Sequence, residues 1–124
     1  MIRNILLVGL GGGLGSIARY LCQKWFTDHY PSHFPWGTFT VNLIGSLLIG
    51  IFWGLSFRNA ESAGAWKLFL MTGICGGFTT FSAFTLEAVG LLRQQRTGLF
   101  FVYIGANVLI GLLATFAGMK IVRL

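Results

Sequence analysis

The residues with the most suggestive chemistry lie in the middle of a long apolar segment, and they are glycines and hydroxyl side chains. The stretch 72–82 reads TGICGGFTTFS. Adjacent glycines weaken a helix by about 1 kcal/mol each relative to alanine, so we expect a break between Gly76 and Thr79. A break releases backbone carbonyls, which suit a hard cation, and helix N-termini, which suit an anion. The alternative is a continuous helix whose glycines pack against a neighbouring helix.

Two phenylalanines at the end of this stretch have a spacing that could serve an anion. Phe81 and Phe84 are three residues apart and therefore share a helix face. Because the edge of an aromatic ring is positive, a small unhydrated anion can rest against it. The chain has 12 phenylalanines, however, and most of them need only face lipid or pack. Their spacing alone does not establish an anion site.

Polar side chains also occupy single faces of several apolar segments. The sets that share a face are Asn42, Gly45 and Ser46; Thr80, Phe84 and Glu87; and Tyr103, Asn107, Gly111 and Thr115. Polar groups in hydrocarbon are costly and usually face the interior of a helix bundle or a water-filled path. Hydrogen bonds between helices are the alternative for any one residue. Because several segments contribute polar groups, we favour a polar pathway for the set as a whole.

Two charged side chains inside the apolar segments suggest a functional role. An arginine at the centre of the bilayer costs about 2.5–3.5 kcal/mol. Arg19 is near the end of its segment, so it can reach the lipid headgroups, or it can line a water-filled vestibule and attract anions. Glu87 can carry a proton, it can be neutral, or it can be bonded to a polar neighbour.

The chain lacks the residue combinations of the common enzyme classes. Neither histidine lies in an apolar segment, and the sequence has no Ser-His-Asp set and no phosphate-binding loop, so we expect no enzyme. Cys22 and Cys75 form no CxxC pair and are expected to be reduced, buried and inert. The net charge is +6 without a basic run. This pattern argues against nucleic-acid binding and favours cations that anchor helix ends.

The elements that must position these residues are membrane helices. Hydrophobic residues make up 55% of the chain and charged residues 10%, whereas soluble domains carry about 25% charged residues. Four apolar segments each reach the roughly 20 residues needed to cross the hydrocarbon core. These segments are 5–26, 36–57, 65–92 and 98–122. We therefore expect an all-α membrane protein with four transmembrane helices, in which residues 1–124 form one domain and the 18 glycines allow close helix packing.

The basic residues are divided almost evenly between the two sides of the membrane. The side that holds the N-terminus has Arg3, Arg58, Lys67, Lys120 and Arg123. The other side has Lys24, Arg93 and Arg96, with Arg19 near that end. A clear excess of Lys and Arg normally fixes orientation, so this weak bias suggests that the chain inserts both ways round. Two oppositely oriented copies would form an antiparallel homodimer.

Several motifs along the chain resemble those of one family. They are GGGLG at 11–15 with Arg19-Tyr20, Gly37-Thr38, Val41-Asn42, Gly45-Ser46, and GICGGFTTFSAF at 73–84. Together they resemble the Fluc (CrcB) fluoride channels, and the resemblance covers essentially the whole chain. The GGFTTFSAF stretch with the upstream Asn42 is the specific part, whereas the glycine-rich start alone would be a weak signal.

The resemblance implies a passive, selective exporter of fluoride in the bacterial inner membrane, built as a dual-topology antiparallel homodimer with two pores. The pore residues that it implies are Phe81, Phe84, Asn42, Tyr103, Thr80, Glu87 and Arg19. It also implies that carbonyls of Gly76 and Thr79 from both subunits hold a structural sodium ion. Asn107 and Gly111 stand where the family often has small hydroxyl side chains. Because Asn107 can donate from its amide, we include it among the pore residues.

Two other functions remain open. A small proton-coupled multidrug exporter also uses four helices and dual topology, but such proteins resemble one another in a membrane glutamate on helix one. This chain has Glu87 on helix three instead. A membrane assembly factor without transport activity would have no reason to carry a broken helix and polar groups on several spans. Protection of cells against fluoride, against cationic dyes or against neither distinguishes the three functions.

Overall fold

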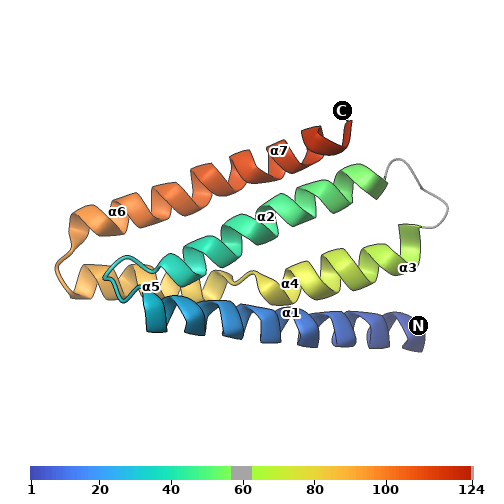
Figure 1. Cartoon of the computed structure of the whole chain (residues 1–124), viewed down its shortest axis with the longest axis horizontal. Coiled ribbons are helices and arrows are strands. Elements are labelled where there is room, and N and C mark those ends of the chain that lie inside the picture. The colour runs from blue at the N-terminus through green and yellow to red at the C-terminus, as the bar shows by residue number, and fades with distance from the viewer. Residues whose placement is uncertain (57–62, 124) are drawn as a thin grey trace.

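The computed structural model describes residues 1–56 and 63–123, and these residues form helices joined by short connections (Figure 1). In chain order the helices are α1 (Ile2–His29), α2 (Trp36–Ser56), α3 (Ala63–Lys67), η2 (Leu68–Cys75), α4 (Gly76–Phe78), α5 (Phe81–Arg93), α6 (Thr97–Gly105), η3 (Ala106–Ile110) and α7 (Gly111–Arg123). The elements η2 and η3 are π-helical, and each continues directly into its neighbours. The third span therefore comprises α3 to α5, and the fourth comprises α6 to α7.

Within the described residues, four helical stretches are long and apolar enough to cross a membrane, as predicted. They are Ile2–His29, Trp36–Ser56, Gly64–Arg93 and Thr97–Val122. Their ends lie close to those expected from the sequence. Residue 57, the expected end of the second segment, and Arg58 lie outside the described residues.

Successive spans run in opposite directions, so both termini lie at the same end of the bundle (Figure 1). α1 lies along η2 and α4, and α7 lies along α2. The described basic side chains near the terminal end are Arg3, Lys67 and Lys120, and those near the other end are Lys24, Arg93 and Arg96. This even division agrees with the weak charge bias, and insertion in both orientations stays a prediction.

Glycines allow two pairs of helices to approach closely. A side chain at Gly15 would overlap the carbonyl of Ile74 in η2, and a side chain at Gly77 would overlap a carbonyl of α1. Elsewhere in the bundle, a side chain at Gly50 would overlap the carbonyl of Thr115 in α7. Small residues let helix backbones pack together in a membrane, where no hydrophobic force drives helices onto each other. The role in packing that we expected for the glycines is confirmed.

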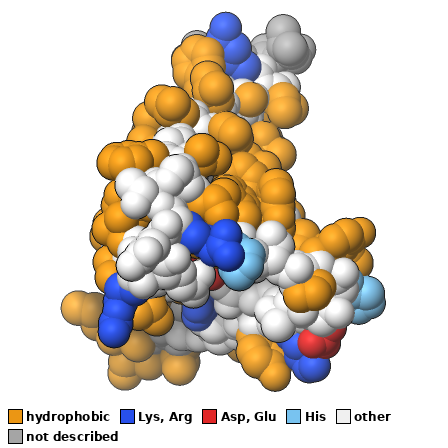
Figure 2. Space-filling view, turned by 90° about the vertical axis from the view of Figure 1, so that its left-hand side faces the viewer, with side chains coloured by type: hydrophobic (Ala, Val, Ile, Leu, Met, Phe, Trp, Pro, Cys, Tyr) orange, Lys and Arg blue, Asp and Glu red, His pale blue; other side chains and the backbone are white. Residues whose placement is uncertain are grey.

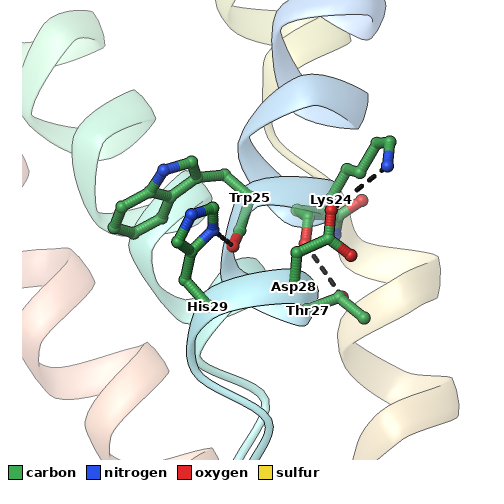
Figure 3. A network of polar contacts seen from close by, with 6 residues as sticks. Lys24, Trp25, Thr27, Asp28 and His29 are labelled. Atoms are coloured by element: carbon green, nitrogen blue, oxygen red, sulfur yellow. Dashed lines mark hydrogen bonds and ion pairs between the residues drawn. The ribbon is translucent and has the colours of Figure 1, made fainter.

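Basic and histidine side chains lie at the end of the bundle where α1 ends and α6 begins (Figure 2). In the last turns of α1, Lys24 Nζ lies 3.1 Å from Asp28 Oδ2, and His29 Nδ1–H donates to the carbonyl of Trp25 at 2.9 Å (Figure 3). The rings of Trp25 and His29 stack with centroids 4.7 Å apart. Tryptophan and helix-end cations are enriched where membrane meets water. This end therefore has the composition of a membrane boundary.

A hydrogen bond joins the two loops at this end of the bundle. Arg96 Nη2 lies 2.9 Å from Nε2 of His33. Because a guanidinium only donates hydrogen bonds, Nε2 of His33 is the acceptor in this contact. The contact joins the loop between α1 and α2 to the residue that precedes α6.

Candidate functional site

The third span is interrupted at Thr79 and Thr80. Both residues have extended backbone, with φ −80° and ψ 158° at Thr79 and φ −149° and ψ 121° at Thr80. The predicted break is confirmed, but it begins after Phe78 and not at the glycines. Gly76 is helical, with φ −63° and ψ −37°, and Gly77 is needed where the span crosses α1. The glycines therefore serve helix packing, and the threonines carry the break.

Asn42 on α2 holds the break in place. Its Oδ1 accepts from the backbone N–H of Thr80 at 2.9 Å, and its Nδ2 donates to the carbonyl of Thr80 at 3.2 Å. The hydroxyl of Thr80 accepts from the backbone N–H of Ala83 at 3.2 Å and so caps α5. A buried backbone group left unpaired costs about 1–3 kcal/mol. One asparagine thus satisfies both backbone groups at the centre of the break.

Arg19 binds the end of the helix that precedes the break. Its Nε–H donates to the carbonyl of Gly77 at 3.1 Å. The last carbonyls of a helix have no partners within the helix, and a cation there also interacts favourably with the helix dipole. Neither alternative considered from the sequence, the headgroups or an anion-attracting vestibule, included this contact. A role of Arg19 in attracting anions stays a prediction.

Replacing Arg19 by leucine is expected to lower the unfolding free energy by about 1–3 kcal/mol, because the carbonyl of Gly77 loses its partner. Arg3→Leu is the matched control, since Arg3 is exposed at the start of α1 and makes no hydrogen bond or ion pair with a described residue. The measurement is the melting midpoint of each variant in detergent, followed by tryptophan fluorescence. Equal midpoints for the two variants would show that the contact with Gly77 adds no stability.

The break leaves two kinds of backbone group without a partner. Among the described residues, the carbonyls of Gly76 and Thr79 and the N–H groups of Phe81 and Ser82 make no hydrogen bond. The carbonyls lie where one half of the helix ends with a negative dipole, and the N–H groups lie where the next half begins with a positive one. Interrupted membrane helices use such ends to coordinate ions. The free carbonyls of the site therefore suit a cation, and its free N–H groups suit an anion.

A cation at this site would have to be held by carbonyl oxygens. In the part of the chain that the structure describes, no group of three or more His, Cys, Asp or Glu side chains could hold a metal ion. The free carbonyls of Gly76 and Thr79 are ligands of the type that hard cations prefer.

Polar side chains of α2 and the fourth span face one another and form hydrogen bonds between the helices, which was the alternative to a polar pathway for any one residue. Asn42 Nδ2 lies 3.4 Å from Oδ1 of Asn107, and Nδ2 of Asn107 donates to the carbonyl of Tyr103 at 2.9 Å. Further along the same two helices, the hydroxyl of Thr115 donates to the carbonyl of Ser46 at 3.1 Å. The polar faces of the two helices therefore meet at the level of the break and beyond it.

A second polar group lies one helical turn before Asn42. The hydroxyl of Thr38 donates to a carboxylate oxygen of Glu87 and accepts from Nε2 of Gln23 at 2.9 Å. Glu87 is thus bonded to a polar neighbour, as one of the interpretations from the sequence had it. The side chain of Tyr103 is fully buried, and its hydroxyl has no hydrogen-bond partner among the described residues.

Thr38 and Gln23 are absent from the set of site residues predicted from the sequence. Thr38 lies four residues before Asn42 and therefore shares its face of α2, a signal that identifies it in retrospect. Gln23 gives no comparable signal, because its role depends on the approach of α1 to α2, which the local sequence does not specify.

Phe81 and Phe84 lie on one face of α5, as predicted. Their ring centroids are 5.9 Å apart, with the planes inclined at 49°. Phe84 also contacts the ring of Tyr103, with centroids 5.2 Å apart. Phe84 is half-buried, whereas Phe81 is 76% exposed. The ring of Phe81 therefore lies on the surface of the single chain.

Two cavities adjoin these residues. The larger one, of about 650 Å³, is lined by the loop between α1 and α2 and by α5, and it includes Thr38 and Glu87. The smaller one, of about 290 Å³, lies at the break and is lined by Asn42, Thr80 and Phe81 among others. Because Thr38 and Asn42 occupy successive turns of α2, the cavities follow one another along this helix. Thr38 in the lining of the larger cavity is thus one helical turn from Asn42 in the lining of the smaller one.

These features define a small helical membrane protein whose third span is interrupted, with asparagine, threonine and phenylalanine side chains around the free helix ends. The family described as CrcB-like protein, Camphor Resistance (CrcB), matches residues 6–119. The chain belongs to this family, and the resemblance inferred from its motifs is confirmed.

Three relatives are named as fluoride-specific ion channel FluC. The protein of Agrobacterium fabrum is 44% identical over 120 residues, which cover 97% of this chain and 96% of the relative. The protein of Rhizobium meliloti is 43% identical over 122 residues and that of Flavobacterium psychrophilum 44% identical over 123 residues, with 98% of both chains covered in each case. The matched region therefore extends over nearly the whole chain.

Proposed function

We propose that this chain is a fluoride-selective ion channel that lets fluoride leave the cell passively and so protects the cell from fluoride toxicity. Relatives named as fluoride-specific ion channels, and not as enzymes, match nearly the whole chain. The structural observation that carries the proposal is the break at Thr79 and Thr80, with free N–H groups beside Phe81. A helix N-terminus and the edge of an aromatic ring both favour an anion.

An anion that enters the larger cavity would exchange water for polar side chains in steps. It would meet Thr38 and Glu87 first, and then the side chains around the break, one helical turn further along α2. The edges of Phe81 and Phe84 would replace further water molecules. Apart from the carboxyl of Glu87, which accepts from Thr38, these groups are neutral side chains or weakly positive ring edges, and conduction requires binding that is weak enough to release the ion.

We further propose that two oppositely oriented copies form an antiparallel homodimer in the bacterial inner membrane. Phe81 and the cavity at the break lie on the surface of one chain, so a single chain does not enclose the pathway. The even division of the described basic side chains supports insertion in both orientations. A two-fold interface between the copies would bring the same surface of each chain together.

The carbonyls of Gly76 and Thr79 fit a hard cation, which we propose to be a structural sodium ion shared by the two copies. Neither carbonyl has a partner among the described residues, and oxygen is the ligand atom that such ions take. The bound ion would satisfy the free carbonyls and tie the two interrupted helices to each other.

A proton-coupled multidrug exporter is the less favoured function. Such an exporter needs a membrane carboxylate that is free to exchange its proton with the substrate. Glu87 is instead bonded to Thr38, and it lies on the third span. The named relatives are channels.

The variant Phe81→Ile tests whether the aromatic ring of Phe81 contributes to fluoride conduction in the proposed channel. We expect fluoride efflux from liposomes to fall roughly 100-fold, which corresponds to about 3 kcal/mol in the barrier, because an aliphatic side chain has no positive edge. Phe101→Ile is the control, since Phe101 is 67% exposed on α6 and its ring contact among the described residues is with its chain neighbour Phe100. Equal efflux through both variants would contradict the assignment of Phe81 to the pathway.

A further inference from the structure

Three spans each contribute one side chain to a chain of hydrogen bonds at the larger cavity. Nε2 of Gln23 in α1 donates to Oγ1 of Thr38 in α2 at 2.9 Å, and that hydroxyl donates to a carboxylate oxygen of Glu87 in α5. All three residues line the larger cavity. Thr38 is 1% exposed, whereas Gln23 is half-buried. The hydroxyl of Thr38 is therefore enclosed between an amide on one side and a carboxylate on the other.

The amide of Gln23 sets the direction in which the hydroxyl of Thr38 donates. A threonine hydroxyl has one proton and two acceptor lone pairs, whereas an amide nitrogen only donates. Because Nε2 of Gln23 occupies a lone pair of Thr38, the proton of Thr38 points away from α1 and toward Glu87. Without the amide, the hydroxyl is free to donate to a carbonyl of the preceding turn of its own helix, as threonines in helices often do.

Close packing of α1 against α2 keeps the amide of Gln23 within reach of Thr38. A side chain at Gly37 would lie 3.2 Å from Cα of Gln23 and 3.4 Å from its Cγ. Glycine therefore lets α2 approach α1 at the residue next to Thr38. Among the described residues, the side chain of Gln23 forms a hydrogen bond with Thr38 and with no other group. The contact with Thr38 is therefore what orients this amide.

We propose that Gln23 is a positioning residue of the channel, which keeps the hydroxyl proton of Thr38 on the cavity side. This inference rests on the proposed fluoride channel, in which an entering anion meets Thr38 and Glu87 first. A hydroxyl whose proton lies on the cavity side can donate it to an arriving anion. A hydroxyl that donates to its own helix presents only lone pairs to the anion. Gln23 thus speeds the entry of fluoride through Thr38.

The first test is a double-mutant cycle between Gln23 and Thr38, read as the rate of fluoride efflux from liposomes. Gln23→Met keeps the length of the side chain and removes its N–H donors, and Thr38→Val removes the hydroxyl. We expect Gln23→Met to lower the rate about fivefold in the wild-type background, as the loss of one neutral hydrogen bond would. It should have no further effect in the Thr38→Val background, because Gln23 acts through Thr38.

Gln95→Met is the matched control, since Gln95 is exposed beyond the end of α5 and lies outside the lining of the cavity. The melting midpoint of each variant is recorded in the same detergent. The midpoint of Gln23→Met should stay near that of the wild type, because a hydrogen bond between membrane helices adds little stability on average.

A second test follows the hydrogen bond to Glu87 and does not depend on conduction. The chain has three acidic residues, so its carboxyl bands in the infrared spectrum are few, and Glu87→Gln identifies the band of Glu87. We expect Gln23→Met to shift this band, because the hydroxyl of Thr38 then donates elsewhere. Adding Gln23→Met to Thr38→Val should leave the band in place, since the hydroxyl is already absent.

Wild-type efflux through Gln23→Met would overturn the inference, and so would a Glu87 band that Gln23→Met leaves unchanged. An equal loss of efflux in both backgrounds, or a loss that only follows a lower melting midpoint, would show that Gln23 serves helix packing and not the hydroxyl of Thr38. If Thr38→Val conducts too slowly for the cycle, the infrared comparison decides. Failure of the proposed function itself looks different, because the wild type and Gln95→Met would then release no fluoride.

Discussion

Gly15→Val is expected to prevent α1 from packing against the third span and to lower the unfolding free energy by about 3 kcal/mol or more. A side chain at Gly15 would overlap the carbonyl of Ile74 and lie 2.8 Å from the backbone nitrogen of Phe78. Both groups are backbone, so no side-chain rotation relieves the overlap. The same packing brings Arg19 to Gly77, and its loss would therefore disturb the break as well.

Gly13→Val is the matched control, because a side chain at Gly13 would meet nothing within 4 Å. Valine also has a higher helix propensity than glycine, so this variant should be at least as stable as the wild type. The melting midpoint in detergent and the elution of each variant on gel filtration measure the difference. Similar midpoints for Gly15→Val and Gly13→Val would mean that α1 does not approach the third span as closely as described.

Asn42→Ala is expected to abolish fluoride efflux and to lower the unfolding free energy by about 2–4 kcal/mol. The substitution leaves the N–H and the carbonyl of Thr80 without partners in an apolar environment, and each unpaired group costs about 1–3 kcal/mol. The extended backbone at the break would then have no support from α2. Loss of stability and loss of efflux should therefore occur together in this variant.

Asn107→Ala supplies the control for stability, since it keeps both hydrogen bonds between Asn42 and Thr80. The melting midpoints of the two alanine variants are compared in the same detergent and lipid. A midpoint for Asn42→Ala as high as that of Asn107→Ala would show that the break does not depend on the asparagine of α2.

The sequence predicts the helices of this protein well because their signals are local. Apolar runs of about 20 residues mark the spans, and the polar residues at intervals of three and four predict which faces meet. Asn42, Asn107 and Tyr103 indeed lie in contact. The break is also predicted, because glycines and threonines together weaken the middle of the third span.

The details that the sequence does not specify depend on which helices are neighbours. The glycines were expected to break the helix, whereas Gly77 lets it cross α1 and the extended residues are Thr79 and Thr80. The contact of Arg19 with Gly77 follows from that crossing, since the two residues are 58 positions apart. Of the two cysteines expected to be buried and unpaired, both are free, Cys75 is buried, and Cys22 is only partly buried. Contacts of this kind join residues that are far apart in the chain, so the local sequence pattern does not predict them.

The proposed function is tested most directly by fluoride efflux from liposomes that contain the purified wild-type protein, with chloride efflux as the control. A fluoride-selective channel predicts fast release of fluoride and no release of chloride above that of protein-free liposomes. No fluoride release from folded and correctly inserted protein would contradict the channel, and export of cationic dyes that depends on Glu87 would then be the function to examine.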